Sequence, residues 1–107
     1  MSNRQGITAH FLIRWLQRVE HIDIDMLRSA MQRDGLNHED DGELVYFIGT
    51  NIGLDIDRLR QEMLQVVYPA ICARAKSVLY KGYRIVISDG SAVTVIPSGK
   101  RHRRRWA

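Results

Sequence analysis

A chain of 107 residues, 45% of them hydrophobic, has the size of one domain with its own core, and this composition excludes a wholly disordered protein. The single cysteine, Cys72, excludes an intrachain disulfide and favours a reducing compartment. No apolar run approaches the roughly 20 residues of a membrane span, and no apolar leader follows Met1, so we expect a cytoplasmic protein without a membrane partner.

The net charge of +4 is divided very unequally along the chain. Residues 1–69 hold seven Arg against eleven Asp or Glu, a net −4, whereas residues 70–107 hold nine Lys or Arg against one acid, a net +8. A basic end of this kind commonly meets nucleic acid, anionic lipid or an acidic protein surface. It can also meet the acidic end of a neighbouring copy.

The first two predicted helices follow polar residues that suit a helix N-cap. Thr8 precedes an apolar stripe at helical spacing, and this first helix is predicted to end near His21. Asp23 is the predicted cap of a second helix that ends at Gly35, and Asp25 in its first turn suits the positive end of the helix dipole.

The next segment repeats this arrangement. Residues 55–63 match residues 23–31 at six of nine positions, and the match extends backwards through Leu12 with Leu44 and Trp15 with Phe47. Residues 44–48 are rich in β-formers, but their alignment with the first helix favours a third helix, and Asp55 is the predicted cap of a fourth. We interpret the repeat as a duplicated helix–corner–helix unit.

A proline and a glycine divide the following segment. Pro69 either kinks one long helix or opens a new one, and we predict a fourth helix to about Val67 and a fifth from Pro69 to about Tyr80. Gly82 is the predicted stop of that fifth helix.

The period then changes from helical to alternating. Asp89-Gly90 between two β-branched runs predicts a hairpin over 83–96, because a type I′ turn needs positive φ at both central residues. A regular two-residue turn would pair Val86 with Val93 and Ile85 with Thr94. The predicted fold is therefore α+β: a single globular domain at 1–97, with four to five helices over about 8–80, followed by a basic tail at 98–107.

The tail is the sharpest functional feature. It places five Lys or Arg within six residues beside a tryptophan, and such residues suit phosphates and exposed bases. Arg74, Lys76, Lys81 and Arg84 extend this charge if the fold presents them on one side. The predicted nucleic-acid-binding residues are Lys81, Arg84, Lys100, Arg101, Arg103, Arg104, Arg105 and Trp106.

The helical units raise a helix-turn-helix DNA reader as an alternative, since Arg58, Arg60 and Gln61 suit base edges. The acids at those helix starts, Asp23 and Asp55 among them, would repel a passing phosphate backbone. A capped helical bundle is the simpler interpretation.

Other candidate chemistry is sparse. The acids in residues 38–43 are close enough for Ca²⁺ or Mg²⁺, but their spacing misses the calcium-loop pattern, and a solvated capping loop is the better interpretation. Cys72 is predicted to be a buried apolar residue on the fifth helix. We predict no metal site, no cofactor and no catalytic residues, and therefore no enzyme.

Two functions remain open from the sequence. The first is a small non-enzymatic accessory protein that binds DNA or RNA through the hairpin and tail. The second is a protein-interaction module, such as a structural subunit, inhibitor or adaptor, that assembles through the hairpin and the oppositely charged ends, with another protein or with copies of itself.

Overall fold

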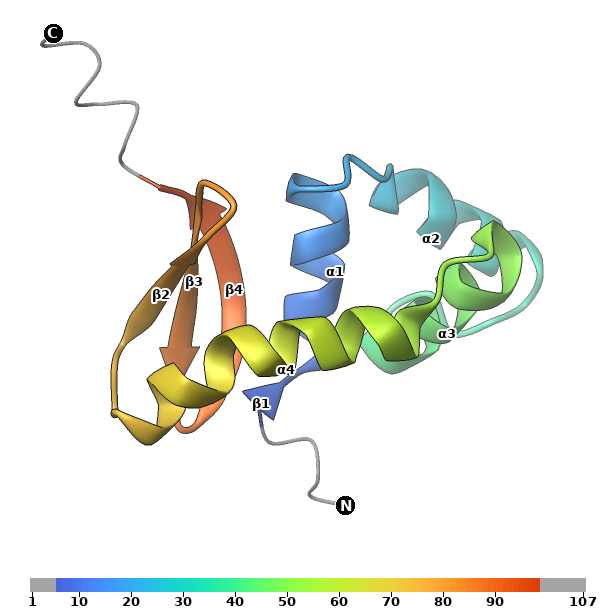
Figure 1. The fold of residues 1–107 in the computed structure, drawn as a ribbon. Coiled ribbons are helices and arrows are strands. Elements are labelled where there is room, and N and C mark those ends of the chain that lie inside the picture. Colours follow the sequence, from blue (N-terminus) through green and yellow to red (C-terminus); the bar gives the residue numbers. More distant parts are fainter. Residues whose placement is uncertain (1–5, 99–107) are drawn as a thin grey trace, which may run out of the picture.

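The computed structural model describes residues 6–98 as an α+β fold of four helices and a four-stranded curled sheet (Figure 1). The elements in chain order are β1 (Gly6–Ile7), α1 (Ala9–Arg18), α2 (Ile24–Arg33), α3 (Asp41–Ile52), α4 (Ile56–Cys72), β2 (Ser77–Tyr80), β3 (Tyr83–Ser88) and β4 (Ser91–Pro97).

Every helix begins at a side-chain cap. The side chains of Thr8, Asp23, Asp40 and Asp55 each accept a hydrogen bond from a backbone N–H in the first turn of the helix that follows. The predicted caps at Thr8, Asp23 and Asp55 are therefore confirmed. The prediction that residues 44–48 are helical is also confirmed, because they lie inside α3.

The first helix is shorter than its apolar pattern indicates. It ends at Arg18 instead of near His21, and His21 adopts a left-handed conformation with φ of 59°. This turn redirects the chain from α1 to the cap of α2.

Aligned positions of the sequence repeat are buried alike in the structure. Leu12 and Leu44 are both fully buried, and so are Met31 and Met63. Trp15 and Phe47, at 1% and 9% exposure, occupy matching places on α1 and α3. The repeat thus supplies apolar side chains to one core from four different helices.

The predicted fifth helix is wrong. Pro69 lies inside α4, which continues to Cys72, so the proline removes one helical hydrogen bond without ending the helix. The residues after it form β2, which pairs antiparallel with β3 from Ser77 opposite Val86 to Tyr80 opposite Tyr83. Cys72, predicted to be buried, is exposed at the end of α4.

A second tight turn explains the new strand. Lys81 and Gly82 have φ of 54° and 82°, as Asp89 and Gly90 have 53° and 78°. Both pairs therefore have the positive angles that a type I′ hairpin turn needs. Gly82 closes a hairpin between β2 and β3 and does not end a helix.

The predicted hairpin is present, but its register is wrong beyond the turn. Ser88 pairs with Ser91 as expected, whereas Val86 pairs with Thr94 and Ile85 with Val95. A bulge near Val86 and Ile87 causes this shift, because an extra residue on β4 changes which face the later side chains point to. As a result Val95, which the regular register with Thr94 opposite Ile85 would put on the other face, is fully buried beside Ile85.

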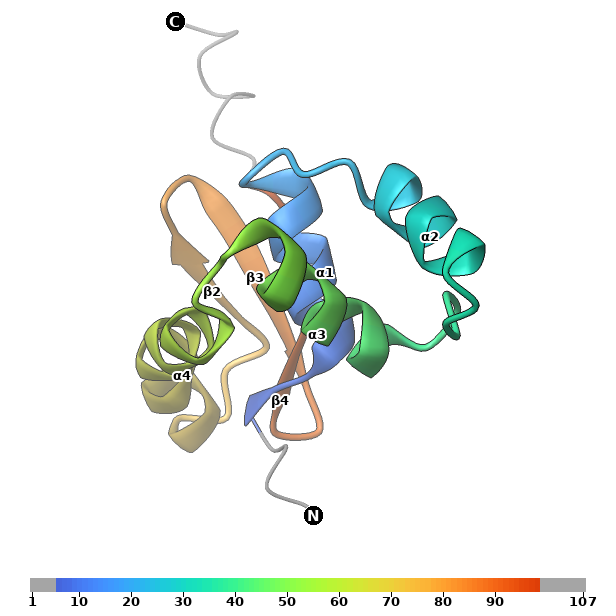
Figure 2. The same ribbon diagram turned by 90° about the vertical axis from the view of Figure 1, so that its right-hand side faces the viewer.

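The sheet packs its buried face on the helices. Its strand order is β1-β4-β3-β2, and β1 pairs parallel with β4. Figures 1 and 2 together place α1 and α4 against one side of the sheet, with α2 and α3 beyond α1. None of the helices described has the length and apolarity that crossing a membrane requires.

Candidate nucleic-acid interface

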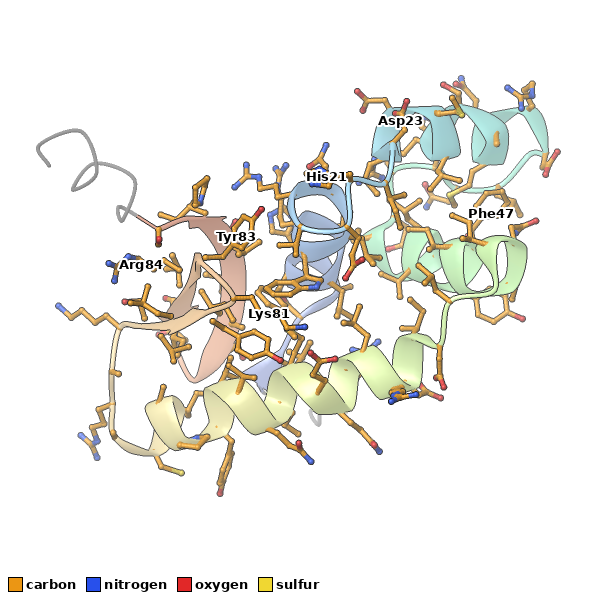
Figure 3. The ribbon with its side chains drawn as sticks, turned by 45° about the horizontal axis from the view of Figure 1, so that its top comes forward. His21, Asp23, Phe47, Lys81, Tyr83 and Arg84 are labelled. Carbon is orange, nitrogen blue, oxygen red and sulfur yellow. The ribbon has the colours of Figure 1, made fainter. Side chains whose placement is uncertain are left out.

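Arg84 lies on the side of the sheet that faces away from the helices. Its neighbour on β3, Ile85, is fully buried, and successive side chains of a strand point to opposite faces. The Arg84 guanidinium donates a 2.9 Å hydrogen bond from Nη1 to Oγ of Ser77 on β2. In Figure 3 the Arg84 side chain points away from the helical part of the molecule.

The register places two exposed apolar side chains on either side of Arg84. Leu79 is its partner on β2 and Ile96 its partner on β4. Leu79 is 59% exposed and Ile96 is 38% exposed. The sequence alone does not single out these two residues, because the predicted fifth helix includes Leu79 and the regular hairpin register puts Ile96 on the same face as Ile85.

Two further basic residues lie where α4 turns into β2. Arg74 adopts a left-handed conformation with φ of 59°, at the position after a helix where glycine is usual. Arg74 and Lys76 line a surface hollow together with Val86, Ser88 and the acidic Asp89. Within residues 6–98 the side chains of Arg74 and Lys76 form no ion pair or hydrogen bond, so their charges are available to a ligand.

Lys81 lies in a different environment from Arg84. Its Nζ is 3.5 Å from Oε2 of Glu62 on α4 and 5.3 Å from the centre of the Tyr80 ring. Figure 3 shows Lys81 turned toward the helices, whereas Arg84 points away from them. The structure therefore does not bring these two predicted binding residues together.

The contacts around Lys81 shift three pKa values. The hydrogen bond from the Tyr80 hydroxyl, supported by the charge of Lys81, lowers the pKa of the Glu62 carboxyl. The same hydrogen bond raises the pKa of Tyr80. The negative charges that Tyr80 and Glu62 carry when deprotonated raise the pKa of Lys81, so the ammonium group of Lys81 stays charged.

The rest of the predicted interface follows Pro97, which pairs with Tyr83 at the end of the sheet. The tail residues lie outside the described residues, so the structure neither places them nor brings them to Arg84. These are Lys100, Arg101, Arg103, Arg104, Arg105 and Trp106.

The acidic loop of residues 38–43 has structural partners. Asp40 caps α3, and Oδ1 of Asp41 is 3.1 Å from Nη2 of Arg28 while Oδ2 is 3.4 Å from Nδ1 of His10. In the part of the chain that the structure describes, no group of three or more His, Cys, Asp or Glu side chains is placed to hold a metal ion.

Helix α2 is poorly suited to reading DNA. The guanidinium of Arg28 is engaged by Asp41 and by the backbone carbonyl of His38. Asp23 is the N-cap of α2, and Asp55 is the N-cap of α4. A negative side chain at each of these helix starts opposes the approach of a phosphate backbone.

Basic groups without an ion pair among the described residues lie on the outward side of the sheet and at the end of α4. Arg33 and Arg58 on the repeated helices are also exposed, but they belong to the acidic part of the chain. Cations that lack acidic partners can neutralise phosphates, whereas Lys81 already shares its charge with Glu62. No protein-family model, no curated protein and no solved structure matches this chain.

Proposed function

We propose that this chain is a small, non-enzymatic accessory protein that binds nucleic acid through its basic end. The observation that carries the proposal is the concentration of positive charge after residue 69, where nine Lys or Arg accompany a single acid, Asp89. Each phosphate that such residues neutralise releases bound counterions, and this release drives association at low salt.

The tail supplies most of the proposed contacts. Lys100, Arg101 and the three consecutive arginines that begin at Arg103 would bind phosphate oxygens, and Trp106 would stack on an exposed base. Arg84 would extend the contact onto the sheet. Lys81 would contribute mainly through its field, because its amine is paired with Glu62.

The repeated helices would then be the scaffold. Their matched buried positions, such as Met31 and Met63, support a duplicated helix–corner–helix platform. Their acidic surface would repel nucleic acid and so confine binding to the other end of the molecule.

A matched pair of variants tests this proposal. In the tail variant, Arg103 and Arg104 are both replaced by Gln, which removes two tail charges. In the control variant, Arg33 and Arg58 are both replaced by Gln, which removes two exposed charges from the acidic end. By fluorescence anisotropy at low salt, the tail variant should bind a labelled oligonucleotide about tenfold or more weakly, and the control should match the native chain. Equal affinities of the tail variant and the native chain would reject the proposal.

A protein-interaction module is the second proposal, and the exposed edge of β2 favours it. In a two-residue hairpin the residues next to the turn form the hydrogen-bonded pair, so the N–H and C=O of Ser77 and Leu79 point away from β3. No hydrogen bond within residues 6–98 uses these backbone groups. A free edge of this kind can pair with a strand of another chain.

Light scattering and a pull-down without nucleic acid test this second proposal. A concentration-dependent increase in mass, lost when Leu79→Pro removes an outward N–H, would support it. A strict monomer that captures no protein would exclude it.

A further inference from the structure

The side of the sheet opposite the helices is an uncovered surface with a defined arrangement. We define the outer face as the six side chains that point away from the helices in two cross-strand rows. One row is Ser77, Val86 and Thr94, and the other is Leu79, Arg84 and Ile96. Figures 1 and 2 show no helix on this side of the sheet.

We propose that the outer face binds single-stranded nucleic acid, with bases lying on the row formed by Leu79, Arg84 and Ile96. This inference rests on the proposed function and specifies its ligand class and a binding surface within the folded part of the chain.

The floor suits the flat face of a base. Leu79 and Ile96 expose 59% and 38% of their surface on either side of the Arg84 guanidinium. A base can stack on a planar guanidinium as it does on an aromatic ring, and apolar neighbours complete the contact. Arg84 is held in place by its 2.9 Å hydrogen bond to Ser77, so less side-chain freedom is lost when a ligand binds.

The charge of the surface matches a polyanion. No acidic side chain belongs to the two rows of the outer face, and Asp89, in the turn beyond them, lines the hollow that also contains Arg74 and Lys76. An acidic partner protein could pair with the cations, but it does not present a flat ring next to each of its negative charges to cover Leu79 and Ile96. A single strand offers both a phosphate and a base in each nucleotide.

Positive charge lies near the end of the face where α4 turns into β2. At this end the backbone carbonyl of Lys76 accepts a 2.9 Å hydrogen bond from the N–H of Ile87, which places Lys76 beside β3. Arg74 lines the same surface hollow as Lys76. At the other end Pro97, opposite Tyr83, leads directly into the basic tail. Lys76 immediately precedes β2, and Leu79 in the row of Arg84 follows it three residues later, about 10 Å along an extended chain, so a strand lying on this row can reach a cation at that end.

A duplex fits this surface less well than a single strand. The bases of a duplex are stacked inside it, so their faces cannot reach Leu79, Arg84 or Ile96, and only phosphates would contact the protein. The exposed apolar side chains therefore favour unpaired bases.

The test compares two double variants of the full chain. In the face variant, both Leu79 and Arg84 are replaced by Gln. In the α2 variant, Met26, an exposed apolar residue, and Arg33 are both replaced by Gln. Anisotropy is measured with a labelled oligo(dT) and with a duplex of equal length, and thermal melting checks that each variant is folded. Ile96→Gln alone serves as a second probe of the same row.

The face variant should bind the single strand about tenfold more weakly, and its duplex affinity should fall less than about threefold. The α2 variant should change neither affinity, and Ile96→Gln should weaken only single-strand binding. Equal losses for both ligands would show phosphate contacts alone and overturn the inference.

The outcomes separate this inference from the proposed function. If the face variants bind normally while the tail variant loses affinity, nucleic-acid binding stands and the outer face is not its surface. If the native chain binds neither ligand at low salt, both fail. If the face variants instead abolish self-association measured by light scattering, the outer face is a contact between copies and the inference is wrong.

Discussion

The hydroxyl of Tyr80 donates a 2.7 Å hydrogen bond to the carboxylate of Glu62 and thereby joins β2 to α4. The Tyr80 ring also stacks on the buried indole of Trp15, with ring centres 5.9 Å apart. One side chain therefore connects the sheet, the long helix and the core, although Tyr80 and Glu62 are 18 residues apart in the sequence.

Tyr80→Phe should lower the free energy of unfolding by about 1 kcal/mol at neutral pH, since a hydrogen bond to a partly exposed carboxylate is lost while the ring stays. Because folding lowers the Glu62 pKa from 4.5, its contribution is present above that pH and is lost as the pH falls through the lower, folded value. Because folding raises the Tyr80 pKa from 10.0, that contribution is present below pH 10.0 and is lost as the pH rises through the folded value.

Urea unfolding of the native chain and Tyr80→Phe across the pH range measures this effect. The difference in unfolding free energy between the native chain and Tyr80→Phe should be constant between pH 4.5 and pH 10.0. It should shrink at more acidic and at more basic pH. A difference that grows as the pH falls below 4.5 would contradict the assignment of Glu62 as the acceptor.

The two aspartates that begin the repeated segments should stabilise their helices to similar extents. Asp23→Ala and Asp55→Ala each remove a side-chain acceptor for a backbone N–H, at a cost of about 0.5–2 kcal/mol. Asp34→Ala is the control, because Asp34 lies at the C-terminal end of α2, where a negative charge is unfavourable. Thermal melting should rank both cap variants below the control.

Matched methionine substitutions test whether both halves of the repeat support one core. Met31→Ala and Met63→Ala each truncate a fully buried side chain and should cost about 2–5 kcal/mol. Met26→Ala, at 64% exposure, should change stability by less than about 0.5 kcal/mol. Chemical denaturation gives all three values, and a negligible effect at Met63 would contradict the packing of α4 on the core.

Arg74→Gly should have opposite effects on stability and binding. Arg74 has a left-handed φ of 59°, which costs a residue with a Cβ more than glycine, so the variant should gain up to about 1 kcal/mol of stability. It should also bind an oligonucleotide severalfold more weakly, because one cation of the basic end is removed. A variant that is more stable and binds as tightly as the native chain would exclude Arg74 from the interface.

Local signals predicted the helical half of the fold well. The caps at Thr8, Asp23 and Asp55 are decided by side chains within three residues of the N–H groups they accept from. The Asp89-Gly90 turn is equally local. Such features depend on few neighbours and can be recognised without tertiary contacts.

The errors occurred where distant contacts decide the structure. Residues 77–80 were predicted to belong to the helix after Pro69, although Val78 and Tyr80 are β-formers, and pairing with β3 makes them a strand. The bulge near Val86 shifts the register of β4, so that Val95 and not Thr94 lies opposite Ile85 on the buried face. Lys81 was predicted to bind together with Arg84 because both are basic, yet Lys81 lies 3.5 Å from Glu62 of α4, on the other side of the sheet from Arg84 (Figure 3).

The most direct test of nucleic-acid binding is the salt dependence of affinity of the full chain for a single-stranded oligonucleotide, measured from about 50 to 200 mM salt. With several Arg and Lys on phosphates, a plot of log affinity against log salt should fall with a slope steeper than about −2, at roughly −0.7 for each phosphate contacted. A slope near zero, or no binding at the lowest salt, would contradict the account.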